Sequence, residues 1–150
     1  MADTATTPET TTTSSTGRIA LLVIGDAISF LLFAGLGRNT HGEASGLAAL
    51  GQVALTALPF ALAWFLVSPW LRVYRRTATD TIWKMFTRTE FAWLITYPAA
   101  LLLRVLLAPD RQMPITFAIV ILLANAVFLG VWRSAFALVE RLLGARAAGA

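Results

Sequence analysis

A single acidic residue, Asp26, interrupts the first apolar stretch of the sequence, residues 19–36. On a helix that begins at residue 19, its carboxyl lies about 10 Å from the helix start, at 1.5 Å per residue. In a membrane helix an ionised aspartate costs roughly 2.5–3.5 kcal/mol, so such a residue usually has a role. Asp26 therefore handles a proton or cation, anchors a polar ligand, or hydrogen-bonds to another helix. For the last role we expect Asn125, near mid-depth in the fourth apolar stretch, as its partner.

A polar turn, residues 37–46 (GRNTHGEASG), follows this stretch and contains the only histidine of the chain. It holds Arg38, His41 and Glu43, between glycines that allow close approach of the backbone. Together with Arg104, near the end of the third apolar stretch, these residues could form an anion-binding pocket. The competing interpretation is a plain polar turn, with Arg104 extending its charged end to the membrane surface.

Two rows of mostly small residues at intervals of four predict close helix packing, because small side chains let neighbouring backbones approach. The first row is Ala92, Thr96, Ala100 and Arg104. It predicts that the last of these residues points along a packed face rather than into lipid. The second row is Ala126, Gly130 and Ser134. It predicts packing within the chain or between copies.

No constellation of catalytic or metal-binding residues stands out. The chain has no cysteine and one histidine, which excludes disulfides and thiolate ligands and argues against an ordinary transition-metal site. It has no nucleophile elbow, phosphate-binding glycine loop or HExxH pair. We therefore expect a protein that is not an enzyme and that has no cofactor.

The composition indicates a membrane protein. Of 150 residues, 57% are hydrophobic and 13% are charged, about half the charged share of a soluble domain. A soluble chain this short could not bury so much apolar surface. The formal charge of +4 is then a feature of membrane topology, and we expect no nucleic-acid partner because the bases flank apolar stretches.

Four apolar stretches approach the ~20 residues that cross a bilayer, at residues 19–36, 47–71, 91–107 and 115–131. They predict an all-α, integral membrane four-helix bundle over residues 18–143. Pro59, in the second stretch, is tolerated where neighbours satisfy the freed carbonyl. Residues 1–17 are rich in Thr and Ser and predict a disordered tail, and residues 144–150 a short C-terminal tail.

The connection over residues 72–90 carries five bases interleaved with apolar residues. Residues 79–88 could lie on the membrane surface as an amphipathic helix. The alternative, which we favour, is a basic loop without a lipid-binding function.

The distribution of bases predicts orientation. Nine Lys and Arg residues lie on the side that holds both termini, against three on the other side. This bias predicts that both termini are cytoplasmic and that the protein is a multi-pass protein of the plasma membrane. Trp70, Trp93 and Trp132 fall at the cytoplasmic ends of their stretches, as in an aromatic belt.

Several short segments resemble one known family. They are Gly25-Asp26, Gly37-Arg38-Asn39-Thr40-His41-Gly42, Thr56-Ala57-Leu58-Pro59-Phe60 with Trp64, Leu103-Arg104, and Val131-Trp132-Arg133. In combination they resemble the bacterial and archaeal membrane proteins grouped as domain of unknown function 3054. The resemblance implies a small integral membrane protein with no assigned activity. It adds weight to Asp26, Arg38, His41, Pro59, Arg104 and Arg133, and it is weakest over residues 72–90.

Three functions compete, and we rank the third, a membrane enzyme, lowest because the sequence shows no nucleophile or metal set. The first is a small transporter or ligand-binding membrane protein with an unknown small-molecule ligand, for which the candidate ligand-binding residues are Asp26, Arg38, His41 and Arg104. The second is an accessory or scaffold subunit of a larger membrane complex, or a self-associating protein. We assign structural polar roles to Asn125, Glu43, Pro59 and Arg133. A continuous polar cavity at Asp26 would favour the first function, whereas an Asp26 that is sealed among satisfied partners would favour the second.

Overall fold

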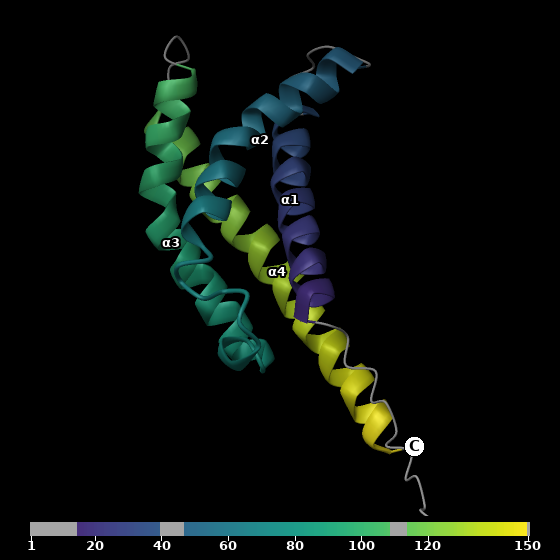
Figure 1. Ribbon diagram of the computed structural model, residues 1–150. Coiled ribbons are helices and arrows are strands. Elements are labelled where there is room, and N and C mark those ends of the chain that lie inside the picture. The colour runs from purple at the N-terminus through teal and green to yellow at the C-terminus, as the bar shows by residue number, and fades with distance from the viewer. Residues whose placement is uncertain (1–14, 40–46, 109–113, 150) are drawn as a thin grey trace, which may run out of the picture.

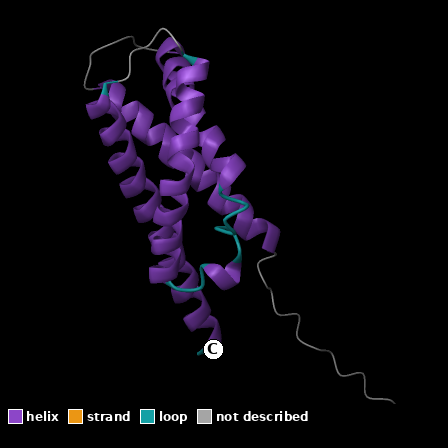
Figure 2. Ribbon diagram, turned by 90° about the vertical axis from the view of Figure 1, so that its left-hand side faces the viewer, coloured by secondary structure: helices purple, strands orange, loops and turns teal. Residues whose placement is uncertain are grey.

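The computed structural model describes residues 15–39, 47–108 and 114–149. Four α-helices follow one another: α1 (Ser15–Asn39), α2 (Leu47–Val67), α3 (Ile82–Leu107) and α4 (Ile115–Ala148). A short 3-10 helix, η1 (Arg76–Ala78), lies between α2 and α3. Within these described ranges the chain forms no strand, which confirms the predicted all-α class (Figure 2).

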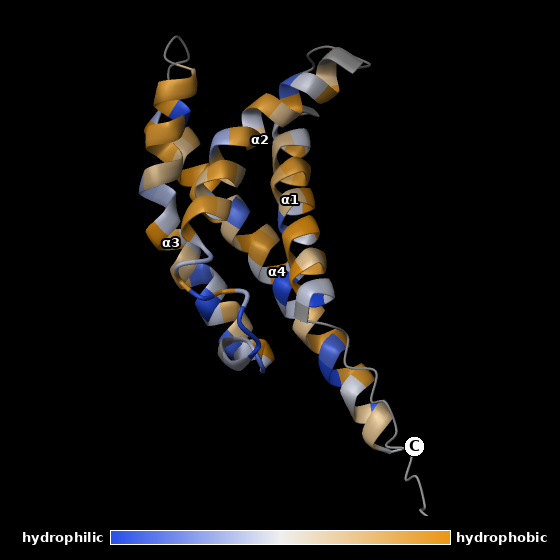
Figure 3. Cartoon of the chain, in the orientation of Figure 1, coloured by the Kyte–Doolittle hydropathy of each residue, from blue (hydrophilic) through white to orange (hydrophobic). Residues whose placement is uncertain are grey.

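All four helices are long and apolar enough to cross a membrane. Hydrophobic residues cover most of their length, whereas hydrophilic residues gather where α1 and α3 begin and α4 ends (Figure 3). We call this the basic end of the bundle, and the opposite end the far end. The arrangement confirms four apolar helices of membrane-spanning length.

The helices contact one another as a ring. Each packs against the two helices next to it, because α1 contacts α2 and α4, and α3 contacts α2 and α4 (Figure 1). The core between them is aromatic: Phe30, Trp64 and Trp93 have ring centroids 5.7–6.4 Å apart. Trp93 is completely buried and donates through its indole N–H to the carbonyl of Leu122. Its predicted place in an interfacial belt is therefore wrong.

The helices differ in length from the predicted stretches. Helix α1 already includes residues 15–17, which were expected in the tail, and α4 continues beyond residue 143 to Ala148. Helix α2 ends at Val67, before the expected residue 71, and a run of backbone turns follows. Pro59 lies within α2 and is buried.

A separate surface helix over residues 79–88 does not form. Thr81 caps the start of α3 by accepting a hydrogen bond from the backbone N–H of Lys84, and the helix continues without a break to Leu107. A threonine in this position satisfies one of the free N–H groups of the first turn. The favoured basic loop is therefore wrong from residue 82 onward, because residues 82–90 form the first turns of α3.

Candidate functional site

Asp26 is completely buried in α1, and its carboxylate is the centre of a polar cluster. Arg133 on α4 donates to it twice, from Nε to Oδ1 at 2.9 Å and from Nη2 to Oδ2. The indole N–H of Trp64 on α2 also donates to Oδ2, at 2.9 Å, and so does the hydroxyl of Tyr74, at 3.1 Å. Four donors from three other parts of the chain thus converge on one carboxylate.

Arg133 is equally buried, and its guanidinium has contacts on all sides. Its Nη1 donates to the backbone carbonyl of Val73 at 3.2 Å. The rings of Trp64 and Tyr74 lie 5.1 and 4.9 Å from the guanidinium carbon, close enough for cation–π attraction. Two-point pairing with a carboxylate is the strongest geometry available to an arginine. The pair therefore neutralises both charges inside the bundle.

Asn125 is not the partner of Asp26. Its amide donates to the carbonyl of Ile121 one turn earlier on the same helix, at 3.0 Å. Along α4 it lies eight residues from Arg133, which is about 12 Å at 1.5 Å per residue. The Oδ1 atom of Asn125 is buried and has no hydrogen-bond partner among the described residues.

A second ion pair, which is partly buried and which the sequence interpretation missed, lies nearer the basic end. Arg18 on α1 is 4% exposed, and it donates to both carboxylate oxygens of Glu140 on α4, at 2.8 and 3.0 Å. It also donates to the hydroxyl of Thr79 and to the backbone carbonyl of Tyr74, at 3.0 and 3.1 Å. The face of Phe136 lies 5.6 Å from its guanidinium carbon.

The signal for this second pair is the order of charges on two antiparallel helices. On α1 a base precedes an acid by eight residues, Arg18 and Asp26, and on α4 a base precedes an acid by seven, Arg133 and Glu140. These separations correspond to about 12 and 10.5 Å of helix. Because α1 and α4 run in opposite directions, each base meets the acid of the other helix. The two pairs fix the register of α1 against α4.

The segment between α2 and α3 is held by both arginines. Arg133 donates to the carbonyl of Val73, and Arg18 donates to the carbonyl of Tyr74, so two consecutive residues of the segment are tied to α4 and α1. Burial, and then the negative charge of Asp26, raise the pKa of the Tyr74 phenol to about 12. Tyr74 therefore stays neutral and remains a hydrogen-bond donor at physiological pH.

The row of small residues on α3 lies on a packed face, as predicted. Ala92, Thr96 and Ala100 are completely buried, and Arg104 is 9% exposed. Arg104 lies on the same face as Thr96, about 12 Å closer to the far end. Of the other proposed ligand-binding and polar residues, His41 and Glu43 lie outside the described residues, and so does the side chain of Arg38. The predicted Arg38–His41–Arg104 pocket stays a prediction.

Among residues 15–39, 47–108 and 114–149, no group of three or more potential metal ligands lies together. The Asp26–Arg133 pair itself is sealed from solvent, since neither residue has exposed surface.

A model of the family described as "Protein of unknown function (DUF3054)" matches residues 23–136. The chain belongs to the DUF3054 family. The match includes Asp26, Trp64, Tyr74 and Arg133, the whole of the central cluster, whereas Arg18 and Glu140 lie outside it. Neither the curated proteins nor the solved structures contain a match to the chain.

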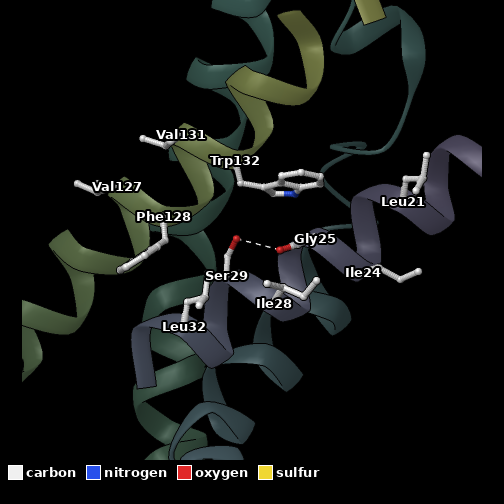
Figure 4. Close-up of a pocket in the computed structure, with 10 residues that line it drawn as sticks. All are labelled: Leu21, Ile24, Gly25, Ile28, Ser29, Leu32, Val127, Phe128, Val131 and Trp132. Atoms are coloured by element: carbon white, nitrogen blue, oxygen red, sulfur yellow. Dashed lines mark hydrogen bonds between the residues drawn. The ribbon is translucent and has the colours of Figure 1, made fainter. Parts of the chain in front are cut away.

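An apolar groove of about 400 Å³ runs between α1 and α4 in this DUF3054 chain. Figure 4 shows the indole of Trp132 beside the backbone of Gly25, and the hydroxyl of Ser29 donating to the Gly25 carbonyl. A Cβ atom on Gly25 would lie 1.9 Å from the indole ring, so only glycine fits. Gly130 belongs to the second row of small residues, and a Cβ atom on it would lie 2.5 Å from the Glu90 carboxylate and 3.0 Å from the Phe86 ring, both on α3. At Gly130 this row therefore packs against a helix of the same chain.

Proposed function

We propose that this protein is an accessory subunit of a larger membrane complex and that it has no chemistry of its own. The observation that carries the proposal is the complete occupation of the Asp26 carboxylate by Arg133, Trp64 and Tyr74. A group that carries protons or binds a solute needs a face open to water or to its cargo. Asp26 has no exposed surface.

The energetics of the ion pair also argue against a transport cycle through Asp26. Separating the partners of a buried ion pair costs about 3–5 kcal/mol, because one charge is left without compensation. A cargo that displaced Arg133 would have to offset this cost and also replace the donors Trp64 and Tyr74. The same contacts suit a structural role, since they join α1, α2, α4 and the segment between α2 and α3.

The outer surface offers what an accessory subunit needs. Large apolar side chains face outward along all four helices, where lipid or the helices of a partner would cover them. The seven exposed cations at the basic end support an orientation with both termini in the cytoplasm, in the plasma membrane.

The test is purification of the tagged protein from native membranes in polymer nanodiscs, followed by quantitative mass spectrometry. We expect a protein partner in a fixed ratio, and the same ratio after a second purification through the partner. Recovery of the chain alone or as a homo-oligomer, with a bound small molecule, would contradict the proposal.

A second candidate, a ligand-binding or transport protein, rests on a different observation. The Oδ1 atom of Asn125 is buried without a partner among the described residues, and an unsatisfied buried acceptor costs about 1–3 kcal/mol. Thr96 and Arg104 are buried in the same far half of the bundle, on α3. A polar ligand that enters from the far end would supply the missing donor.

Cysteine labelling separates this candidate from the first. The natural chain has no cysteine, so Asn125→Cys introduces the only thiol. If a polar path exists, a membrane-impermeant maleimide should modify this thiol from the far side. Protection of the thiol until the protein is denatured would contradict the ligand-binding function.

A further inference from the structure

Two adjoining hollows lie on the surface where α2 ends and α3 begins. One, of about 270 Å³, is lined by Trp70, Leu71, Arg72, Arg88 and Phe91. The other, of about 380 Å³, is lined by Thr77, Lys84, Thr87, Arg88 and Phe91. Because Arg88 and Phe91 line both, the two hollows form one surface feature, which we call the basic hollow.

The backbone is unusual where it places Arg72 in this hollow. Arg72 has φ of 58°, the left-handed region that side chains other than glycine rarely adopt. It is the only residue other than glycine with positive φ in the part of the chain that the structure describes. The turn before it is closed by a hydrogen bond from the Arg72 N–H to the carbonyl of Pro69. Strained residues of this kind are concentrated at binding sites.

A second cation is held in place across the hollow. Arg88 donates from Nε and Nη2 to the carbonyl of Leu71, at 3.2 and 3.1 Å, which joins α3 to the residue before Arg72. Lys84, one turn earlier on α3, pairs with Asp80 at 3.0 Å at an exposed site. The basic hollow therefore has three bases, Arg72, Arg88 and Lys84, and one neighbouring acid, Asp80. The nearby Glu90 contributes nothing here, because its carboxylate lies against Gly130 on α4.

The apolar members of the hollow lie on one side of these cations. Trp70 is 85% exposed and Phe91 is 62% exposed, although both are large and apolar. Phe91 begins the apolar part of α3, whereas Arg88 and Lys84 precede it by one and two turns. The hollow thus joins a cationic rim to an apolar wall at the level where a membrane surface would lie.

We infer that the basic hollow binds the head group of an anionic phospholipid, with the phosphate between Arg72, Arg88 and Lys84 and the acyl chains along Trp70 and Phe91. Arginine holds phosphate oxygens with two parallel N–H groups, and tryptophan prefers the interface between head groups and acyl chains. A free phosphate would use the cations alone and would gain nothing from the exposed aromatic rings. This inference is independent of the proposed accessory role.

The test is native mass spectrometry of the detergent-solubilised chain during titration with phosphatidylglycerol, phosphatidylcholine and sn-glycerol 3-phosphate. We expect one phosphatidylglycerol to bind at least tenfold more tightly than phosphatidylcholine, and no adduct with sn-glycerol 3-phosphate. The double variant R72Q/K84Q should lose about 25-fold in affinity for phosphatidylglycerol, because each cation that contacts the phosphate contributes about fivefold.

The matched control is R75Q/R76Q, which removes the same charge from exposed residues of the same segment that do not line the hollow. We expect this variant to bind phosphatidylglycerol within about twofold of the natural chain. If R72Q/K84Q does not fold, Arg72→Gly removes one cation while relieving the positive φ, and it should lose about fivefold in affinity. Equal losses in the test and control variants, equal binding of phosphatidylcholine, or equal binding of sn-glycerol 3-phosphate would each overturn the inference.

Discussion

Breaking the Asp26–Arg133 pair from either side should destabilise the protein strongly, whereas removing both charges should cost less than the sum. Asp26→Asn leaves a buried guanidinium without its counter-charge, and Arg133→Met leaves a buried carboxylate without one. Each single substitution should lower the free energy of unfolding by about 3–5 kcal/mol. The asparagine in the first variant still offers an acceptor to Trp64 and Tyr74, so its cost comes mainly from the charge.

The double variant Asp26→Asn/Arg133→Met contains no unpaired buried charge. We therefore expect its cost to be close to that of one single variant, which gives a favourable coupling energy of about 3–5 kcal/mol between the two positions. The assay is equilibrium unfolding in detergent or bicelles, with the natural chain and the three variants in one double-mutant cycle.

Arg141→Met is the control, because Arg141 lies on an exposed face of the same helix. It should change the free energy of unfolding by less than about 0.5 kcal/mol. Additive effects of Asp26→Asn and Arg133→Met, or single effects no larger than that of the control, would refute the claim that this pair holds the helices together.

Three further perturbations test other parts of the fold. Gly25→Ala should displace Trp132 and destabilise the chain by about 1–3 kcal/mol, which tryptophan emission and thermal unfolding would report; an unchanged emission would contradict the tight contact. Glu140→Gln should destabilise it by about 1–3 kcal/mol, less than a break in the central pair because Glu140 is partly exposed; equal losses would contradict this ranking. The pKa of Tyr74 is raised from 10.0 to about 12, so its contribution to stability is fully present below pH 10 and is lost as the pH rises through 12. In the variant Tyr97→Phe, Tyr74 is the only tyrosine, and ultraviolet titration should show that it ionises near pH 12. Ionisation near pH 10 would contradict its burial.

The membrane class and the number of helices could be predicted because they depend on apolar length alone. Four stretches of suitable length produced four helices, each close to the expected place. Helix ends depend on single hydrogen bonds instead. The cap at Thr81 starts α3 nine residues before the third apolar stretch, so a basic segment and that stretch form one helix. A hydropathy average cannot distinguish this arrangement from a separate surface helix followed by a membrane span.

The partner of Asp26 could not be predicted because Arg133 was interpreted as a base beyond the end of the fourth stretch. Helix α4 continues past residue 131 without a break, and this places Arg133 against α1 inside the bundle. Arg18 was likewise counted among the topological bases, although it is buried against Glu140. Both helices carry a base followed seven or eight residues later by an acid, and this pattern is visible in the sequence. It predicts the two ion pairs only once α1 and α4 are known to be neighbours.

The most direct test of the sealed ion pair is the accessibility of its neighbour Val73 in the folded protein. Val73 is completely buried, its carbonyl accepts from Arg133, and replacing it with cysteine changes little volume while leaving both charges in place. Because the natural chain has no cysteine, the new thiol is unique, and Arg75→Cys provides an exposed thiol in the same segment. The sealed pair predicts that a membrane-impermeant maleimide labels Arg75→Cys rapidly and leaves Val73→Cys unlabelled until the protein unfolds. Labelling of both variants at similar rates would reveal water beside the pair and contradict the structural role of Asp26.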